Sequence, residues 1–315
     1  MNREIKIDNK LIRNLQKKNN FKAVNYTLTR ILFHILLSIS IYFLIQSNYF
    51  FLTTLLLVLH FSSFSFMGLA GIGHELLHNT VFSNKTYNQI FYKVFCILTY
   101  NNYSFFEFTH WEHHKHSLSK NDPKDLFKGK INIFHLILLL TFDFKSFYRR
   151  VRILILNSIG IIPGKIGKEL FPKGSIKQKK VTKSARVILF FQLTSSLIFV
   201  YFGVYEFIFL VTLAPFTMTF VNKLFAISQH YGLQENSNDL ISCRTILLNP
   251  FLSYFYANMN YHVEHHLYPG VPLYNLKKVH NLVTEKYDYP NLSNGFFGVI
   301  IDLKKKGLFS LSFNS

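Results

Sequence analysis

The sequence predicts an all-α integral membrane protein with two transmembrane helical hairpins, four spans in all, and a cytosolic helical cap. Three observations support this fold class. Hydrophobic residue types make up 49% of the 315 residues, with 35 Phe and 18 Tyr, which is typical of multi-pass membrane proteins. Long apolar runs occur in closely spaced pairs. Three short histidine clusters lie between these pairs, and we expect the cap to carry them.

The first hairpin is predicted from the apolar runs 31–46 and 49–72. The second run is about 36 Å long as a helix, enough to cross a hydrocarbon core of about 30 Å. The first run is shorter, about 24 Å, and we expect it to extend at both ends. Gln46, Ser47 and Asn48 separate the runs and predict a tight turn.

The second hairpin is predicted from residues 187–204 and 207–228, with its turn at Tyr205 and Glu206. Pro215 should kink the last helix, because proline lacks the backbone N–H that a helix interior needs. Three other apolar runs, residues 87–100, 131–142 and 151–162, are too short to span. Segments of this length are typical of the membrane interface or a buried core.

Basic residues predict the topology. Residues 1–30 hold eight Lys or Arg, residues 74–186 hold nineteen and residues 223–306 hold eight, which together are all 35 in the chain. The positive-inside rule then places both termini, the central segment and all the histidine clusters in the cytoplasm. We therefore assign the net charge of +19 to membrane topology rather than to nucleic-acid binding. The two cysteines, Cys96 and Cys243, form no paired pattern, which fits a reducing compartment.

The chain shows no repeat, low-complexity linker or cleavable signal peptide. We interpret residues 1–315 as a single domain. It consists of a basic cytosolic segment (1–30), a catalytic core (31–285) and a cytosolic tail (286–315).

The histidine clusters predict a metal site. Neutral imidazole is a preferred ligand of iron, zinc and copper, and residues at i, i+3 and i+4 share one face of a helix. Eight histidines exceed the four to six ligands of a single ion, so the pattern predicts two metal ions. The predicted ligands are His74 and His78, then His110, His113 and His114, then His262, His265 and His266.

Other interpretations of these residues stay open at this point. His74-Glu75-x-x-His78 also matches the zinc protease motif, although that leaves five or more histidines unexplained. A metal transporter is a second alternative, but transporters place polar groups near the bilayer midplane. Glu112 and Glu264, like Glu75, either orient a neighbouring imidazole or are simply solvated. The remaining histidines, His34, His60, His116, His135 and His280, are interpreted as packed, interfacial or solvated.

Four segments resemble the membrane fatty acid desaturase family, which includes lipid hydroxylases and carotenoid ketolases. Residues 73–82 resemble its first histidine box, 110–116 its second and 260–269 its third. Residues 228–232 are similar to the site of an extra ligand, which makes His230 a ninth candidate. The resemblance covers residues 30–285. It implies a four-helix bundle with a cytosolic cap that binds two iron ions, and catalysis without a separate protein acid or base.

The resemblance also implies the reaction and its partners. We expect O₂-dependent desaturation of a fatty acyl chain or lipid, with hydroxylation of a lipid or oxidation of a carotenoid as alternatives. No haem-binding segment is apparent, so a separate electron donor of the ferredoxin or cytochrome b5 type is expected. Two positions depart from the family pattern. Lys124 follows Asp122-Pro123 where relatives often carry an acid, and Ala226 replaces an Asn that holds a metal-bound water in acyl-CoA desaturases.

Overall fold

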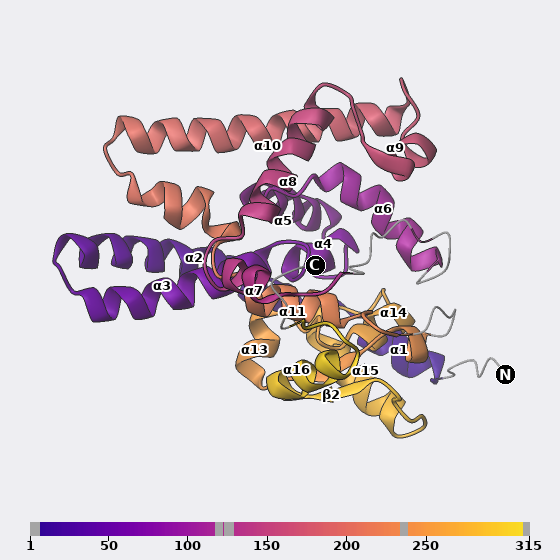
Figure 1. Ribbon diagram of the computed structural model, residues 1–315. Coiled ribbons are helices and arrows are strands. Elements are labelled where there is room, and N and C mark those ends of the chain that lie inside the picture. The colour runs from indigo at the N-terminus through magenta and orange to yellow at the C-terminus, as the bar shows by residue number, and fades with distance from the viewer. Residues whose placement is uncertain (1–6, 117–121, 123–128, 234–238, 311–315) are drawn as a thin grey trace.

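The computed structural model describes residues 7–116, 122, 129–233 and 239–310, and the chain is mostly helical (Figure 1). Within these ranges, three helical segments are long and apolar enough to cross a membrane: Asn20–Gln46, Phe50–Leu77 and Ile176–Tyr201. These candidate helices match three of the four predicted spans.

The first hairpin forms as predicted, from α2 (Asn20–Gln46) and α3 (Phe50–Phe64). Helix α2 begins well before the apolar run, because the Asn19 side chain caps it by accepting from the Lys22 N–H at 3.0 Å. The turn uses Asn48, whose φ of 59° is left-handed, a conformation that asparagine tolerates better than most residues.

Helix α2 has a polar interior face and an apolar exterior. Its buried side chains recur every three or four residues and include Thr27, His34 and Ser38. Its exposed side chains include Leu36 and Phe43, each 62% exposed. This inversion of the water-soluble pattern is expected for a helix that faces lipid.

The predicted fourth span is not a continuous helix, which corrects the expectation of a kink. Helix α10 (Ile176–Tyr201) ends at a turn that contains Gly203. The chain then returns as three short pieces: η2 (Ile208–Thr212, π-helical), η3 (Ala214–Phe216, 3₁₀) and α11 (Phe220–Ser228). Pro215 lies in η3. Just after it, the backbone pairs with another segment instead of within a helix, because Met218 N donates to Thr141 O at 2.8 Å. A helix interrupted this way keeps its backbone paired only by using other segments.

Both hairpins project from the same side of a compact body, and both ends of the described chain lie on that body (Figure 1). The two hairpin tips touch, because Gln46 Nε2 donates to Glu206 Oε1 at 3.1 Å. The three shorter apolar runs form α5, α7 and α8 within the body. The helical elements of the body are α1 (Asn9–Leu15), η1 (Ser65–Met67), α4 (Ile72–Leu77), α5 (Lys85–Leu98), α6 (Tyr103–His116), α7 (Ile133–Leu140), α8 (Phe144–Ser158), α9 (Gly164–Leu170), α12 (Asp239–Ser242), α13 (Pro250–Phe255), α14 (His262–Leu267), η4 (Leu273–Asn275), α15 (Leu276–Thr284) and α16 (Gly295–Lys305).

A two-stranded parallel sheet anchors the C-terminal part of the body. Strand β1 (Thr245–Leu247) pairs with β2 (Leu292–Asn294), with Ile246 opposite Ser293. Strand β1 also holds the chain that leads into α14, since Ile246 N donates to Asn260 O and Asn260 Nδ2 donates to Ile246 O, both at 2.8 Å. The sheet therefore fixes where the third histidine box begins.

Candidate metal centre

Five histidines from three elements converge in what we call the first cluster. It contains His74 and His78 at the end of the first hairpin, His110 and His114 on α6, and His265 on α14. His110 Nε2 lies 2.8 Å from His78 Nε2 and 3.0 Å from His114 Nε2, and His114 Nε2 lies 3.3 Å from His265 Nε2. The ring nitrogens thus point at a common centre.

Close backbone packing positions α4 and its histidines. Gly71 precedes α4 in an extended conformation, and a Cβ there would lie 1.9 Å from the Phe66 carbonyl oxygen. A Cβ on Gly73 would lie 2.9 Å from the Gly68 carbonyl oxygen. Only glycine permits this approach without a backbone shift, so the two glycines hold His74 against the end of the hairpin.

A second cluster contains His230, His262 and His266, with the Cys243 thiol beside them; all four are buried, and their candidate ligand atoms lie within 4.8 Å of one another. His262 Nε2 lies 2.9 Å from His230 Nε2 and 3.1 Å from His266 Nε2. His113 lies beside this cluster, with its ring centre 5.2 Å from those of His230 and His266. The second and third boxes are therefore divided between the clusters, because successive positions on a helix point to different sides.

Oxygen atoms contact the Nδ1 atoms of several of these rings, the nitrogens that face away from the clusters. His113 Nδ1 lies 2.7 Å from Asp122 Oδ2, and His230 Nδ1 lies 3.0 Å from the Ser242 carbonyl oxygen. His74 Nδ1 lies 3.3 Å from Glu75 Oε1. A neutral imidazole that donates from Nδ1 has its lone pair on Nε2. These contacts therefore direct lone pairs into the two clusters, as metal ligation requires.

Residues 47–295 match the family model of fatty acid desaturases. The chain belongs to the fatty acid desaturase family. No match to a curated protein was found. Histidine-rich sites in the family are known to bind two iron ions, and the two groups of inward lone pairs fit such a pair. Nitrogen-rich ligation of this kind suits iron.

Burial keeps three of the clustered imidazoles neutral. Desolvation, followed by the neighbouring histidines, holds the pKa of His78, His110 and His266 well below the ordinary value of 6.5. Neutral imidazole is the form that ligates metals, so the site needs no proton release from these side chains before it binds a cation.

The three box glutamates differ in their surroundings, which separates the two interpretations left open above. Glu75 contacts two first-cluster rings, at 2.9 Å from His265 Nδ1 and 3.3 Å from His74 Nδ1. This contact from behind the rings differs from the exposed general base of a zinc protease. Glu112 pairs instead with Lys115 on the surface of α6.

Glu264 has a structural role away from both clusters. It forms a hydrogen bond to His280, accepts from Thr245 Oγ1 at 2.7 Å and accepts from Tyr289 Oη at 2.9 Å. It therefore ties α14 to β1 and α15. His280 belongs to this network, as its interpretation as a packed residue predicts.

Four residues near the second cluster were not predicted from the sequence. Asp122 and the Ser242 carbonyl contact ring nitrogens as described above, and Asp239 Oδ1 lies 3.5 Å from His266 Nδ1. Cys243 Sγ lies 3.8 Å from His230 Nδ1, the nitrogen turned away from the cluster centre. Of these four, only Asp122 lies in a segment that the sequence analysis singled out, the Asp122-Pro123-Lys124 stretch after the second box. Pro123 and Lys124 lie outside the described residues.

The other histidines lie away from the clusters. His34 Nδ1 lies 3.3 Å from His60 Nδ1 inside the first hairpin, and His60 Nε2 donates to the Leu210 carbonyl at 2.7 Å. This arrangement confirms that both are hydrogen-bonded, packed residues. His116 lies 3.7 Å from Glu112 on the surface, and His135 is half-buried in α7.

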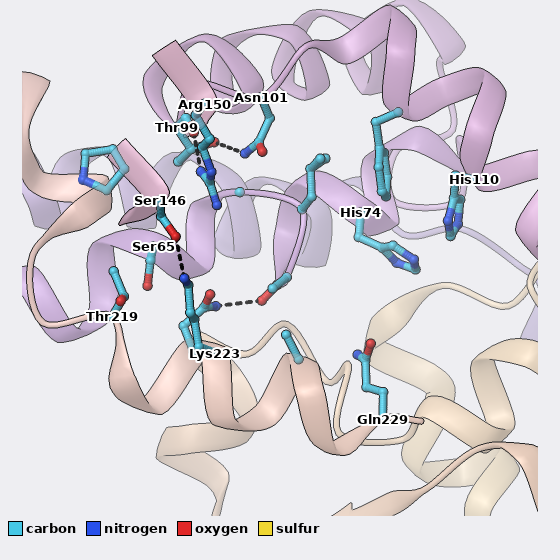
Figure 2. A pocket seen from close by; sticks show the side chains of 17 residues that line it. Ser65, His74, Thr99, Asn101, His110, Ser146, Arg150, Thr219, Lys223 and Gln229 are labelled. Carbon is cyan, nitrogen blue, oxygen red and sulfur yellow. Dashed lines mark hydrogen bonds between the residues drawn. The ribbon is translucent and has the colours of Figure 1, made fainter. Parts of the chain in front are cut away.

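Two hollows reach the metal centre from the side of α8. A partly open cavity of about 220 Å³ is lined by His74 and His110 at one end (Figure 2). A groove of about 820 Å³ between α6, α8 and α9 reaches His110 and His113. His230, His262 and His266 line neither hollow. Ala226 lines the cavity, so the position where acyl-CoA desaturases carry an Asn has no side-chain amide.

Proposed function

We propose that this family member is an O₂-dependent oxidoreductase that desaturates a fatty acyl chain or lipid, using a di-iron centre bound by nine histidines. The observation that carries the proposal is the pair of clusters with inward-directed imidazole nitrogens, in a chain that matches the desaturase family over residues 47–295. The proposed ligands are His74, His78, His110, His113, His114, His230, His262, His265 and His266.

The protein residues supply binding, orientation and exclusion of water. Two bound iron ions would supply the reduction of O₂ and the oxidising power to remove hydrogen from an unactivated methylene. Glu75 and Asp122 would hold ligand rings in the correct tautomer. The cavity beside His74 and His110 would hold the carbon atoms to be oxidised. No side chain beyond the ligands is assigned as an acid or base.

The stoichiometry of desaturation requires a source of electrons. Two C–H bonds on adjacent carbons break and a C=C bond forms, while O₂, two electrons and two protons become two waters. We propose that the electrons come from a separate donor protein, such as a ferredoxin or cytochrome b5. The basic residues of the predicted cytoplasmic segments would attract either an acidic donor or anionic lipid headgroups. Transfer of oxygen to the carbon instead would give an alcohol, which is the hydroxylase alternative.

Expression with a reductase and donor tests the reaction. Gas chromatography of fatty acid methyl esters should show a new monoene or diene and should depend on O₂. A matched His110→Ala strain controls for background oxidation. If hydroxy acids or carotenoid ketones were the only new products, the metal site would remain and desaturation would be wrong.

We also propose that both termini and the metal centre face the cytoplasm. The distribution of basic residues supports this topology, and so does the projection of both hairpins from one side of the body (Figure 1). Cys96 and Cys243 are buried, so an introduced surface cysteine would react selectively. Ser47→Cys at a hairpin tip and Lys173→Cys on the body should label from opposite sides of the membrane. Labelling of both from one side would contradict the topology.

A further inference from the structure

The cavity beside the first cluster has two chemically different ends (Figure 2). His74 and His110 lie at one end. Arg150, Lys223 and Ser146 lie at the other, with Ser65 and Thr219 close by. A cavity that held only the middle of a hydrocarbon chain would need apolar walls throughout, so the cationic end requires its own explanation.

The charges at this end do not cancel. Lys223 Nζ forms an ion pair with Asp143 Oδ2 at 2.5 Å and also donates to Ser146 Oγ. Burial alone would raise the pKa of Asp143, but Lys223 and Ser146 lower it below its ordinary value, so the carboxylate is charged. This pair is neutral overall, and the charge of Arg150 remains.

The guanidinium of Arg150 has more N–H donors than hydrogen-bond partners among the described residues. One guanidinium nitrogen donates to the Thr99 carbonyl at 2.7 Å, and the guanidinium carbon lies 5.6 Å from the centre of the Phe216 ring. Burial lowers the pKa of Arg150 to about 10, so it stays protonated at neutral pH. Within the described residues no carboxylate forms an ion pair with it, whereas a guanidinium has five N–H donors.

Two buried hydroxyls at the same end also lack an internal partner. Thr219 is 3% exposed, and neither Thr219 Oγ1 nor Ser65 Oγ has a hydrogen-bond partner among the described residues. Buried polar groups are almost always hydrogen-bonded in folded proteins. An oxygen-rich ligand at this end would accept from both hydroxyls and from Arg150.

We propose that the Arg150–Thr219 end of this cavity binds an anionic oxygen group of the substrate, of which a carboxylate is the simplest, while the carbon to be oxidised lies at the His74–His110 end. A single negative charge would balance Arg150. Arg150 and His110 both line this cavity of about 220 Å³, so a short chain is enough to join the two groups. Both residues also line the larger groove, which would hold the rest of the substrate. The substrate is therefore an acid or phosphate oxidised near its polar head, not at the middle of a long chain.

This inference rests on the proposed function for the oxidation step, but its test measures binding and needs neither iron nor turnover. The full-length protein is placed in nanodiscs and incubated with radiolabelled octanoate, with empty nanodiscs to subtract membrane uptake. Unlabelled octanoate, octyl phosphate, octanol and octyltrimethylammonium then compete. The anionic competitors should displace the label about ten- to hundred-fold more effectively than octanol, as expected for a charged hydrogen bond.

Variants test whether this cavity causes the preference for anionic over neutral ligands. Arg150→Gln should remove most of the discrimination between octanoate and octanol, and Arg150→Lys should restore part of it. Thr219→Val should weaken octanoate several-fold. The matched control is Arg152→Gln, an exposed residue of the same helix that lines neither hollow. Gly68→Ala should weaken all ligands, because its Cβ would lie 2.9 Å from Thr99 Oγ1 and 3.1 Å from Asn101 Nδ2.

Each outcome decides the inference. Equal displacement by octanol and octanoate in the wild type would overturn it, as would full discrimination in Arg150→Gln. If Arg150→Gln did not fold, the wild-type competition and Thr219→Val would still decide. Preference for octyl phosphate over octanoate would identify a phosphate head rather than a carboxylate. Anion binding without any oxidised product would instead refute the proposed reaction and leave this site intact.

Discussion

The two histidine clusters differ in what surrounds them. The first cluster borders the partly open cavity through His74 and His110, and two of its five members are only half-buried. The second is buried throughout, except that its neighbour His113 borders the groove. The first cluster therefore borders the cavity that we propose for the substrate, while the second is enclosed by other parts of the described chain. Two metal ions in these positions would bind with different access to ligands from outside.

The largest effect is expected from the ligands themselves. Replacing any of the nine histidines by Ala should reduce turnover by more than about a hundred-fold, beyond the cost of losing an outer-shell partner. His262→Ala tests the enclosed cluster and His110→Ala the cluster beside the cavity. Product formation by purified, reconstituted protein measures the effect. Full activity in His230→Ala would remove that residue from the ligand set while leaving the other eight.

A smaller effect is expected from the carboxylates that orient the ligand rings. Glu75→Gln acts on the first cluster and Asp122→Asn on the second, and each should lower activity or metal affinity about ten- to hundred-fold. Glu112→Gln is the matched control and should remain close to wild type, because Glu112 contacts Lys115 at the surface. Equal losses in all three variants would show that general destabilisation, rather than ring orientation, causes the effect.

The histidine pair in the first hairpin should affect stability more than chemistry. His34→Ala leaves the His60 imidazole without its 3.3 Å partner, at a cost of about 1–3 kcal/mol for an unsatisfied buried group. Thermal unfolding in detergent measures this loss, and activity per folded molecule should stay within about two-fold of wild type. A hundred-fold loss of activity in a folded variant would assign the pair to the reaction.

The smallest effect is expected at Cys243. Its sulfur is one of the four candidate ligand atoms of the second cluster, but it lies 3.8 Å from His230 Nδ1, the nitrogen that contacts the Ser242 carbonyl. Cys243→Ala should therefore keep both metal sites and change activity by less than about three-fold. Cys243→Ser is the matched polar control. Loss of one metal ion in both variants would instead show that the thiolate is a ligand. The second cluster would then have a sulfur ligand, which the first cluster lacks.

Much of this site was predictable because histidine spacing and helix geometry are local. The i, i+3 and i+4 positions of His110, His113 and His114 predict a helix with all three on one arc, and α6 has that form. Spacing does not predict which of the two clusters each of these three histidines joins. His113 turns to the second cluster because the rings of α14 approach α6 from another direction, which depends on tertiary packing.

The errors have equally physical causes. Hydropathy predicts that residues 207–228 can enter a membrane, but it does not detect that the chain around Pro215 divides into η2, η3 and α11 instead of forming one bent helix. Asp239 and Cys243 lie near His266 and His230 only because the segment before β1 folds back over α11. No pattern within the sequence connects those positions.

Metal content tests the central claim most directly. Protein purified from iron-fed cells should contain about two irons per chain, and His110→Ala and His262→Ala should each contain fewer, with zinc-loaded protein inactive. Elemental analysis with a parallel activity assay makes this measurement. A single tightly bound zinc ion with full activity would contradict the di-iron account and return the His74–His78 motif to the protease interpretation.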